Sequence, residues 1–264
     1  AWLGFFTAWG CGQAYGDGNF DIVLTIAWLA PGGAMLLCRK SEGTGFDPDA
    51  LGLKPHFKGN VASYLFAYVF PTALALLTGL LFFSTHPGYY DPRGEALSAS
   101  LVASGLTQEQ ASGMLNSMVG MAVLAGPLVN ILLSLTEVLG FFGWLLPKAA
   151  GLFERDVPLK AALAVSGVWA VWRAPLYFDA YLYGRDYPGF PFVGLGLGLL
   201  FHFLLGLVLS YMTLRTGSVW PAALSQGGVS AAAVLGVYFC KGESLLVVGP
   251  SVYGAFGCLA LLRS

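Results

Sequence analysis

Residues 190–213 read FPFVGLGLGLLFHFLLGLVLSYMT, a run of 24 residues without Asp, Glu, Lys or Arg. A helix of about 20 apolar residues is long enough to cross the hydrocarbon core of a bilayer. The whole chain has the same character, since 56% of its 264 residues are hydrophobic, 10% are charged and the mean hydropathy is +0.70. Soluble domains are about 45–50% apolar and about 25% charged. The sequence therefore predicts an integral membrane protein.

Apolar segments of membrane-spanning length recur along the chain. They are too long for strands and lack the alternation of a membrane β-barrel, so helices are expected to make each crossing. The predicted fold class is all-α: a polytopic membrane helical bundle of about eight transmembrane helices, forming a single domain over residues 1–264. Ala1 already lies in an apolar stretch, so we expect the N-terminus to be incomplete. The segments are residues 1–15, 20–38, 61–84, 112–147, 158–176, 190–213, 217–238 and 244–262.

The distribution of Lys and Arg predicts the orientation of these segments. Cytoplasmic loops carry an excess of both residues. One set of alternate loops is rich in them, whereas the opposite loops hold only Arg93, Arg185 and Lys241. We therefore expect both termini to lie in the cytoplasm. The basic set comprises Arg39, Lys40, Lys54, Lys58, Lys148, Arg155, Lys160, Arg215 and Arg263.

Charge and cysteine content argue against two other classes of protein. The net charge of -1 offers no basic surface for DNA or RNA, so no nucleic-acid partner is expected. The cysteines show no CxxC spacing and are interpreted as small buried hydrophobes rather than a metal or disulfide framework. The expected partners are the lipid bilayer and other membrane proteins. The cysteines are Cys11, Cys38, Cys240 and Cys258.

Polar side chains inside the predicted spans are the candidate functional residues. Such residues are costly in a bilayer and tend to face the bundle interior or a cavity. Four of them lie in three apolar segments, and the fifth is the histidine of residues 190–213. They are Glu137, Arg173, His202, Gln226 and Ser230.

The sequence around these residues resembles the CPBP intramembrane proteases, the group that includes the CAAX-processing enzyme Rce1 and the Abi-type proteins. TEVLGFFGWLLPKAAG (136–151) is similar to the first motif of that family, which has two adjacent Glu residues and then an Arg. VWAVWRAPLYFDAYLYGRDYPG (168–189) resembles the second motif, in which an aromatic residue precedes a His by four positions. TGSVWPAALSQGGVSAA (216–232) resembles the third, a His followed four positions later by Asn or Asp. The resemblance implies an Rce1-like fold and a CAAX-type endopeptidase activity.

The framework of these motifs is kept, but their chemistry is degenerate. The resemblance implies that Glu and His residues activate a water molecule and that the Asn helps to stabilise the oxyanion. Of the corresponding positions, only the first Glu is retained, as Glu137. The others hold residues that neither take up a proton near neutral pH nor titrate there. These positions are Val138, Phe142, Arg173, Gln226 and Ser230.

The favoured function is therefore that of a non-enzymatic structural or accessory subunit, or a binding partner, in a membrane complex. The alternative is an active CPBP-type intramembrane endopeptidase that uses Glu137, and a transporter is a weaker third interpretation. An isolated charge at this depth costs at least about 2.5–3.5 kcal/mol. We therefore expect Glu137 and Arg173 to form a buried ion pair. Alternatively, Arg173 extends to the outer headgroups beside the tyrosines that follow it.

The remaining polar residues have simpler interpretations. Gln226 and Ser230 are expected to form hydrogen bonds between helices, as small polar residues do in membrane bundles. His202 is expected to be a neutral histidine bonded to a neighbouring helix, with axial ligation of a haem or chlorophyll-type pigment as the lesser alternative. We expect no metal and no other cofactor.

Overall fold

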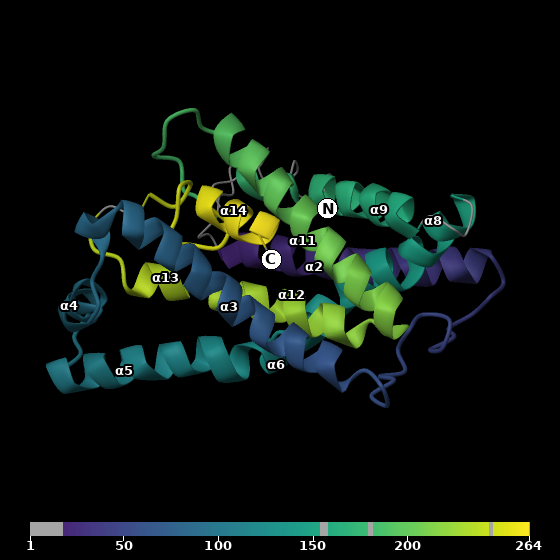
Figure 1. The fold of residues 1–264 in the computed structure, drawn as a ribbon, viewed down its shortest axis with the longest axis horizontal. Helices are drawn as coiled ribbons and strands as arrows, with labels where there is room; N and C mark the ends of the chain where they lie inside the picture. The colour runs from purple at the N-terminus through teal and green to yellow at the C-terminus, as the bar shows by residue number, and fades with distance from the viewer. Residues whose placement is uncertain (1–17, 154–157, 179–181, 243–244, 264) are drawn as a thin grey trace.

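The computed structural model describes residues 18–153, 158–178, 182–242 and 245–263. These residues form helices and no named strand, which confirms the all-α prediction (Figure 1). The longer helices are α2 (Gly18–Ser41), α3 (Val61–Thr85), α5 (Gln108–Gly120), α9 (Pro158–Arg173), α11 (Phe192–Thr216) and α12 (Trp220–Ala232). The shorter ones are η1 (Pro87–Tyr89), α4 (Glu95–Ala103), α6 (Gly126–Val129), α7 (Ile131–Val138), α8 (Leu146–Leu152), α10 (Pro175–Phe178), α13 (Leu235–Tyr238) and α14 (Ala255–Arg263). Two π-helical turns, η2 (Met121–Ala125) and η3 (Leu139–Leu145), interrupt the path from α5 to α8.

Among the described residues, five helical stretches are long and apolar enough to cross a membrane. The predicted segment 112–147 forms two of them, and these meet at Asn130. The predicted segments 217–238 and 244–262 instead contain short helices, the longest of 13 residues. The predicted segment 1–15 lies outside the described residues, so the count of eight stays a prediction. The five stretches are Val61–Thr85, Gln108–Val129, Ile131–Leu152, Pro158–Phe178 and Phe192–Thr216.

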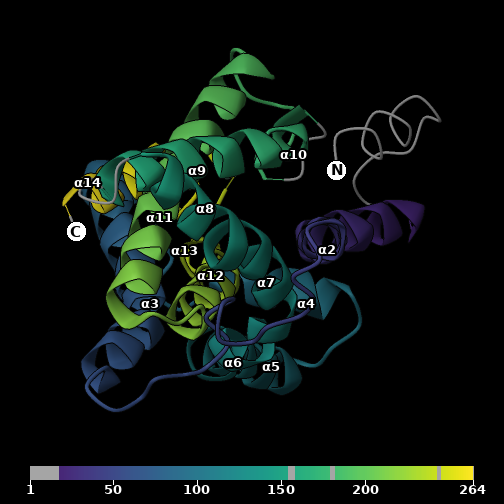
Figure 2. The same ribbon diagram turned by 90° about the vertical axis from the view of Figure 1, so that its right-hand side faces the viewer.

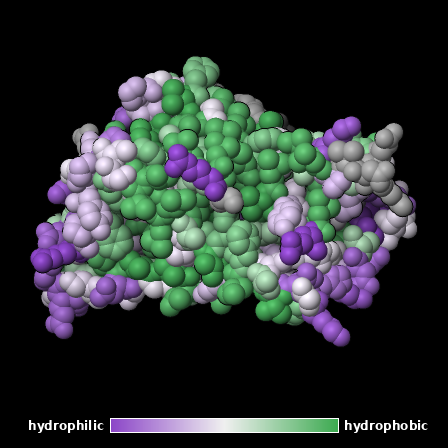
Figure 3. Space-filling model, viewed as in Figure 1, coloured by the Kyte–Doolittle hydropathy of each residue, from purple (hydrophilic) through white to green (hydrophobic). Residues whose placement is uncertain are grey.

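The surface carries the apolar belt expected of a membrane protein. Figure 3 shows a broad hydrophobic band across the middle of the molecule, with polar residues concentrated towards its two ends. Large apolar side chains are exposed on several helices, as Leu76 on α3 and Leu132 on α7 illustrate at 65% and 69% exposure. In water such a surface would be unfavourable, whereas lipid tails solvate it. The protein is therefore a membrane protein whose outer helices face a bilayer.

Helix α12 is the central element of the bundle. It packs against α3, α6, α7 and α11, and Figure 2 shows it surrounded by other helices. Every residue from Pro221 to Val229 is buried. Small residues permit this close packing: Gly227 lies against Asn130 of the α6–α7 junction, and Gly228 against Pro71 of α3. This central position carries Gln226 into the middle of the bundle.

The path through α6, α7 and η3 is irregular for identifiable reasons. Pro127 supplies no backbone N–H for the carbonyl four residues earlier, which lies in the π-helical turn η2. The helix is interrupted again at Asn130 before it resumes at Ile131. Two residues beyond Glu137 the backbone widens into the π-helical turn η3. Such turns occur frequently at functional sites because they alter the direction of side chains. Glu137 thus stands between two departures from regular helix.

Candidate functional site

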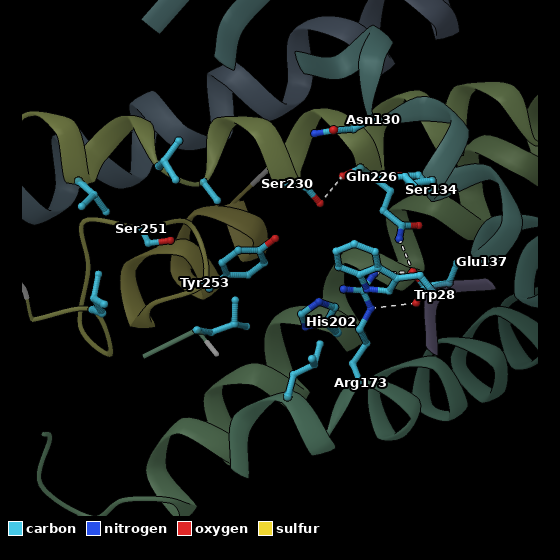
Figure 4. A pocket seen from close by; sticks show the side chains of 17 residues that line it. Trp28, Asn130, Ser134, Glu137, Arg173, His202, Gln226, Ser230, Ser251 and Tyr253 are labelled. Carbon is cyan, nitrogen blue, oxygen red and sulfur yellow. Dashed lines mark hydrogen bonds and ion pairs between the residues drawn. The ribbon is translucent and has the colours of Figure 1, made fainter. Parts of the chain in front are cut away.

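The carboxylate of Glu137 is the centre of a buried polar cluster. Glu137 is 1% exposed. Oε1 accepts hydrogen bonds from Trp169 Nε1 at 2.7 Å and from Arg173 Nε at 2.8 Å. Oε2 accepts from Gln226 Nε2 at 2.7 Å and from Nη2 of Arg173 (Figure 4). Four donors from α9 and α12 therefore converge on one carboxylate of α7.

Arg173 binds this carboxylate in a bidentate manner. It is the last residue of α9, and its side chain is 11% exposed. Its guanidinium carbon lies 5.5 Å from the ring centroid of Trp169, one helical turn earlier. Two parallel hydrogen bonds and a cation–π contact hold the guanidinium in place. The structure thus directs Arg173 towards Glu137, and the two charges neutralise each other.

Gln226 connects α12 to the same cluster with a defined amide orientation. A carboxylate only accepts hydrogen bonds, so the NH2 group of Gln226 must be the atom that faces Glu137. The amide oxygen Oε1 then points elsewhere, and it is buried without a hydrogen-bond partner among the described residues. Buried acceptors without a partner are uncommon in folded proteins. This oxygen is enclosed by the surrounding protein atoms.

The other motif positions have structural surroundings of their own. Val138 and Phe142 are 0% exposed and belong to the hydrophobic core. Phe142 packs edge-on against Trp169 with ring centroids 5.6 Å apart. Ser230 donates to the backbone oxygen of Gln226 at 3.2 Å, one turn back on its own helix. The side chains of Val138, Phe142 and Ser230 form no hydrogen bond with Glu137, and of the three only Ser230 lines the cavity beside it.

His202 lies in the same region but bonds to other groups. Its Nδ1 contacts the hydroxyl of Tyr177 on α10 and lies 3.0 Å from the backbone oxygen of Gly198. The ring of Tyr253 stacks on the imidazole at 5.8 Å with an interplanar angle of 8°, and Trp169 contacts it edge-on. The imidazole is 2% exposed. His202 is thus held in an aromatic environment by a hydrogen bond to a neighbouring helix.

A cavity of about 460 Å³ adjoins the cluster (Figure 4). Helices α2, α7, α9, α11 and α12 all contribute to its wall, as does the segment 245–253. Asn130 at its edge is fixed by a hydrogen bond from Nδ2 to the backbone oxygen of Gly227 at 3.2 Å. The polar side chains in its wall include those of Asn130, Ser134, Glu137, Arg173, His202, Gln226, Ser230, Ser251 and Tyr253.

The sequence did not identify several residues of the site, among them Trp169 and Tyr177. Trp169 donates to Glu137, and Tyr177 holds His202. The position of Trp169 was detectable, because it precedes Arg173 by four residues and so lies on the same helix face. Nothing in the local sequence links Tyr177 to His202, which lies 25 residues further along the chain.

The side chains of the site do not form an evident metal centre. Within the described ranges, no three His, Cys, Asp or Glu residues gather in a position to hold a metal ion. Protein sites for zinc use three or four such ligands. Glu137 and His202 line one cavity, but the guanidinium of Arg173 already occupies both carboxylate oxygens. The donor set at Glu137 is therefore a poor fit for a cation.

A family model covers the segment that forms this site. Residues 119–232 match the model described as Type II CAAX prenyl endopeptidase Rce1-like. The chain carries an Rce1-like domain. The match begins near the end of α5 and ends at the last residue of α12, so it includes all six motif positions and His202. Comparison with curated proteins gives no match, and comparison with solved structures gives none either.

Proposed function

We propose that this chain is a non-proteolytic Rce1-like membrane protein that serves as a structural or accessory subunit, or a binding partner, in a membrane complex. The proposal rests on one observation: both oxygens of Glu137 are occupied by hydrogen-bond donors. Activation of water for peptide hydrolysis requires a group that accepts its proton. The guanidinium, the indole N–H and the amide NH2 around Glu137 only donate.

The energetics of the cluster support the same conclusion. A carboxylate in a low-dielectric interior is stabilised by charge-assisted bonds that would have to break before it could bind a proton. Val138 and Phe142 add apolar contacts where the family motif has a carboxylate and a guanidinium. The cluster thus supports a fixed arrangement of α7, α9 and α12. A bundle with a fixed shape and a wide apolar surface is suited to contacts with other membrane proteins.

His202 supports the alternative, an active endopeptidase that uses Glu137. It lines the same cavity as Glu137. If Nδ1 donates to Tyr177 and the tyrosine hydroxyl donates to Gly198, then Nε2 is the acceptor nitrogen of the ring. A neutral imidazole with a free acceptor is a competent general base. In this alternative, Glu137 would have to exchange its donors for substrate.

A cleavage assay distinguishes the two functions. Purified protein is reconstituted into vesicles with membrane-anchored peptides, beside Glu137→Gln and His202→Gln variants and an active CPBP protease as positive control. We expect the positive control alone to cleave, with the wild-type protein indistinguishable from both variants. Cleavage by the wild type that either substitution abolishes would establish the endopeptidase and reject the proposal.

Gentle extraction from native membranes tests the subunit role. We expect a stoichiometric complex on size-exclusion chromatography, with the partner identified by mass spectrometry. A monomeric protein in every mild detergent would contradict that role. The same sample tests the pigment alternative, because a macrocycle ligated by His202 would give a visible absorbance band that His202→Gln removes.

A further inference from the structure

Helix α14 runs back along α3, and this packing fixes the depth of its residues. Phe256, in the first turn of α14, contacts Phe82 near the end of α3 with ring centroids 6.1 Å apart. Ala260, one turn later, lines a surface groove together with Leu77 of α3. Arg263 is the last residue of α14 and follows Phe256 by seven residues, a rise of about 10 Å. The same rise back from Phe82 reaches the middle of α3 to within about one turn.

Helix α11 places the end of α14 at the same depth. Asn60, which precedes α3, donates to the backbone oxygen of Thr216 at the end of α11 at 3.4 Å, so α3 and α11 are antiparallel. Helix α14 therefore runs in the same direction as α11. Cys258 contacts the backbone oxygen of Leu197 of α11 at 3.7 Å. Arg263 lies five residues further, about 7.5 Å, which is level with the middle of α11 to within about one turn.

Arg263 is thus a charged residue near the centre of the bilayer. Helices α3 and α11 are both candidate spans of 25 residues, so their midpoints lie near the centre of the hydrocarbon core. Arg263 is exposed, and it forms no ion pair with another described residue. Figure 3 shows a hydrophilic spot within the hydrophobic band where Figure 1 shows α14. The distribution of Lys and Arg predicted a cytoplasmic Arg263, whereas this packing places it at mid-depth.

A charge at this depth needs a counter-ion. Charged residues inside a membrane are rare and almost always pair with one another or face a water-filled cavity. Either head-group region is about 15 Å away, half the thickness of the hydrocarbon core, which is beyond the reach of an arginine side chain. The phosphate of a lipid stays in that head-group region. A carboxylate carried by a protein segment that crosses the bilayer can reach the guanidinium.

An apolar groove beside Arg263 has the shape to receive such a segment. Its volume is about 510 Å³, and it is lined by eight apolar residues of α3 between Ala62 and Leu77 and by Ala260 of α14. From Ala62 to Leu77 it follows α3 for about 22 Å, or about four helical turns. Ala260 and Arg263 are three residues apart and so share one face of α14. Small residues such as Ala73 and Ala260 let a second helix approach closely.

From these observations we propose that the groove and Arg263 form a docking face for a transmembrane helix of another protein, one that carries Asp or Glu near its middle. The carboxylate pairs with the guanidinium of Arg263, and the helix packs along α3. A lipid chain would fill the groove but would leave Arg263 without a counter-ion. The inference rests on the proposed function, because it names the contact through which a partner in the membrane complex is held.

Defined helices test the docking face without knowledge of the natural partner. The full chain in phosphatidylcholine vesicles receives synthetic Leu/Ala helices of about 22 residues with Glu, Gln or Leu at the centre. Energy transfer between labelled protein and labelled helix measures binding. We expect the Glu helix to bind roughly three- to thirtyfold more tightly than the Gln helix, and to lose this advantage when Glu is moved two turns from the centre. Equal binding of the Glu and Gln helices would overturn the proposal.

Charge variants assign the preference to Arg263. Arg263→Gln should abolish it, and Arg263→Glu should transfer it to a helix with Lys at the centre. Arg215→Gln is the matched control, because Arg215 is also an exposed arginine but lies in the last turn of α11, at the edge of the span. It should leave the preference unchanged. A preference for Glu that survives Arg263→Gln would reject the docking face.

The groove and the bilayer are tested in the same assay. Ala73→Trp should weaken binding of every helix by filling the groove, whereas Leu132→Trp on α7, a position 69% exposed outside the groove, should not. Equal binding by these two variants would show that the groove is not the contact. Vesicles that contain phosphatidylglycerol should give the same preference for Glu. Loss of the preference there would assign Arg263 to lipid phosphate and overturn the proposal.

Extraction from native membranes separates this inference from the proposed function. We expect Arg263→Gln to lose the stoichiometric complex that the wild-type protein forms. A complex that persists unchanged in Arg263→Gln would reject the docking face and leave the subunit role intact. Absence of any complex with the wild type would overturn the subunit role, and the synthetic helices would still decide whether the face binds a carboxylate.

Discussion

Gly140 lies directly against Pro31: a β-carbon at position 140 would come within 2.7 Å of three Pro31 atoms, two of them in the backbone. This contact brings α2 onto the segment that follows Glu137, and with it Trp28 towards the cavity. Backbone atoms cannot move aside as the end of a side chain can. We expect Gly140→Ala to lower the free energy of unfolding by about 1–3 kcal/mol, the usual cost of overpacking.

Gly33→Ala is the matched control for this substitution. Gly33 lies in α2, two residues after Pro31, but a β-carbon there would meet nothing within 4 Å. Because Ala favours helix over Gly, this variant should be as stable as the wild type or slightly more stable. Both free energies are measured by denaturant titration in mixed micelles. Equal stability of the two variants would show that the Pro31 contact is not tight.

The pair formed by Glu137 and Arg173 should behave as one energetic unit. Arg173→Leu leaves a buried carboxylate without its counter-ion, which costs about 3–5 kcal/mol. The double variant Glu137→Leu, Arg173→Leu removes both charges, so we expect it to be more stable than Arg173→Leu alone. A double-mutant cycle of unfolding free energies measures the coupling. Strict additivity of the two single effects would contradict the buried pair.

An exposed ion pair provides the reference for that cycle. Lys148 and Glu42 pair on the surface, with side chains 45% and 36% exposed. Solvent screens such pairs, so Glu42→Ala is expected to change the free energy of unfolding by about 0–1 kcal/mol. A similar loss from Glu42→Ala and Arg173→Leu would mean that burial does not strengthen the inner pair.

Asp91 should make the stability of the loop before α4 depend on pH. Burial raises the pKa of this carboxyl, but hydrogen bonds from the backbone N–H groups of Ala96, Glu95 and Arg93 and the charge of Lys241 lower it more. The net pKa lies below its ordinary value of 3.8. Its stabilising contribution is therefore complete above that pH and lost as the pH falls through the lowered pKa.

Hydrogen exchange of α4 measures this effect. In the wild type, amide protection of Glu95–Ala103 should fall below about pH 4, where the Asp91 carboxylate takes up a proton. Asp91→Asn cannot titrate, so its protection should be lower at neutral pH and should change less with acid. A wild-type protein whose α4 protection is the same on both sides of that pH would refute the role of Asp91.

The predicted orientation can be tested at the two polar ends of the molecule. Lys58 precedes α3 and Glu109 lies in α5, and both residues are exposed. In a cysteine-free background, we expect Lys58→Cys to react with an impermeant maleimide only after the membrane is opened. Glu109→Cys should react in intact cells, because the positive-inside rule puts its loop outside. The reverse pattern would invert the predicted topology.

The sequence predicted the all-α class and the Rce1-like family because both depend on local patterns. Long uncharged runs specify helices in a bilayer, and the spacing of the motifs can be recognised even where individual motif residues differ. The length of the last helices was not predictable in the same way. Segment 217–238 is apolar enough to suggest a span, yet α12 ends at Ala232, and protein rather than lipid surrounds it. Hydropathy does not distinguish these two environments.

The candidate site was predictable in its members but not in its geometry. Glu137, Arg173 and Gln226 stood out because polar side chains are rare in apolar segments. The four donors on one carboxylate depend on the relative rotation of α7, α9 and α12, which no local pattern encodes. The cavity depends further on the path of segment 245–253.

The crowding of donors around Glu137 also bears on how such a site can change by mutation. Arg173→His alone would withdraw the counter-ion from a buried carboxylate, while Gln226→His alone would add a titratable ring beside a fixed cation. We therefore expect each single substitution towards the motifs of active CPBP proteases to lower the stability of the protein, and most proteins are only marginally stable. Substitutions that remove proteolytic residues from this fold would then be tolerated more easily than the single substitutions that restore them.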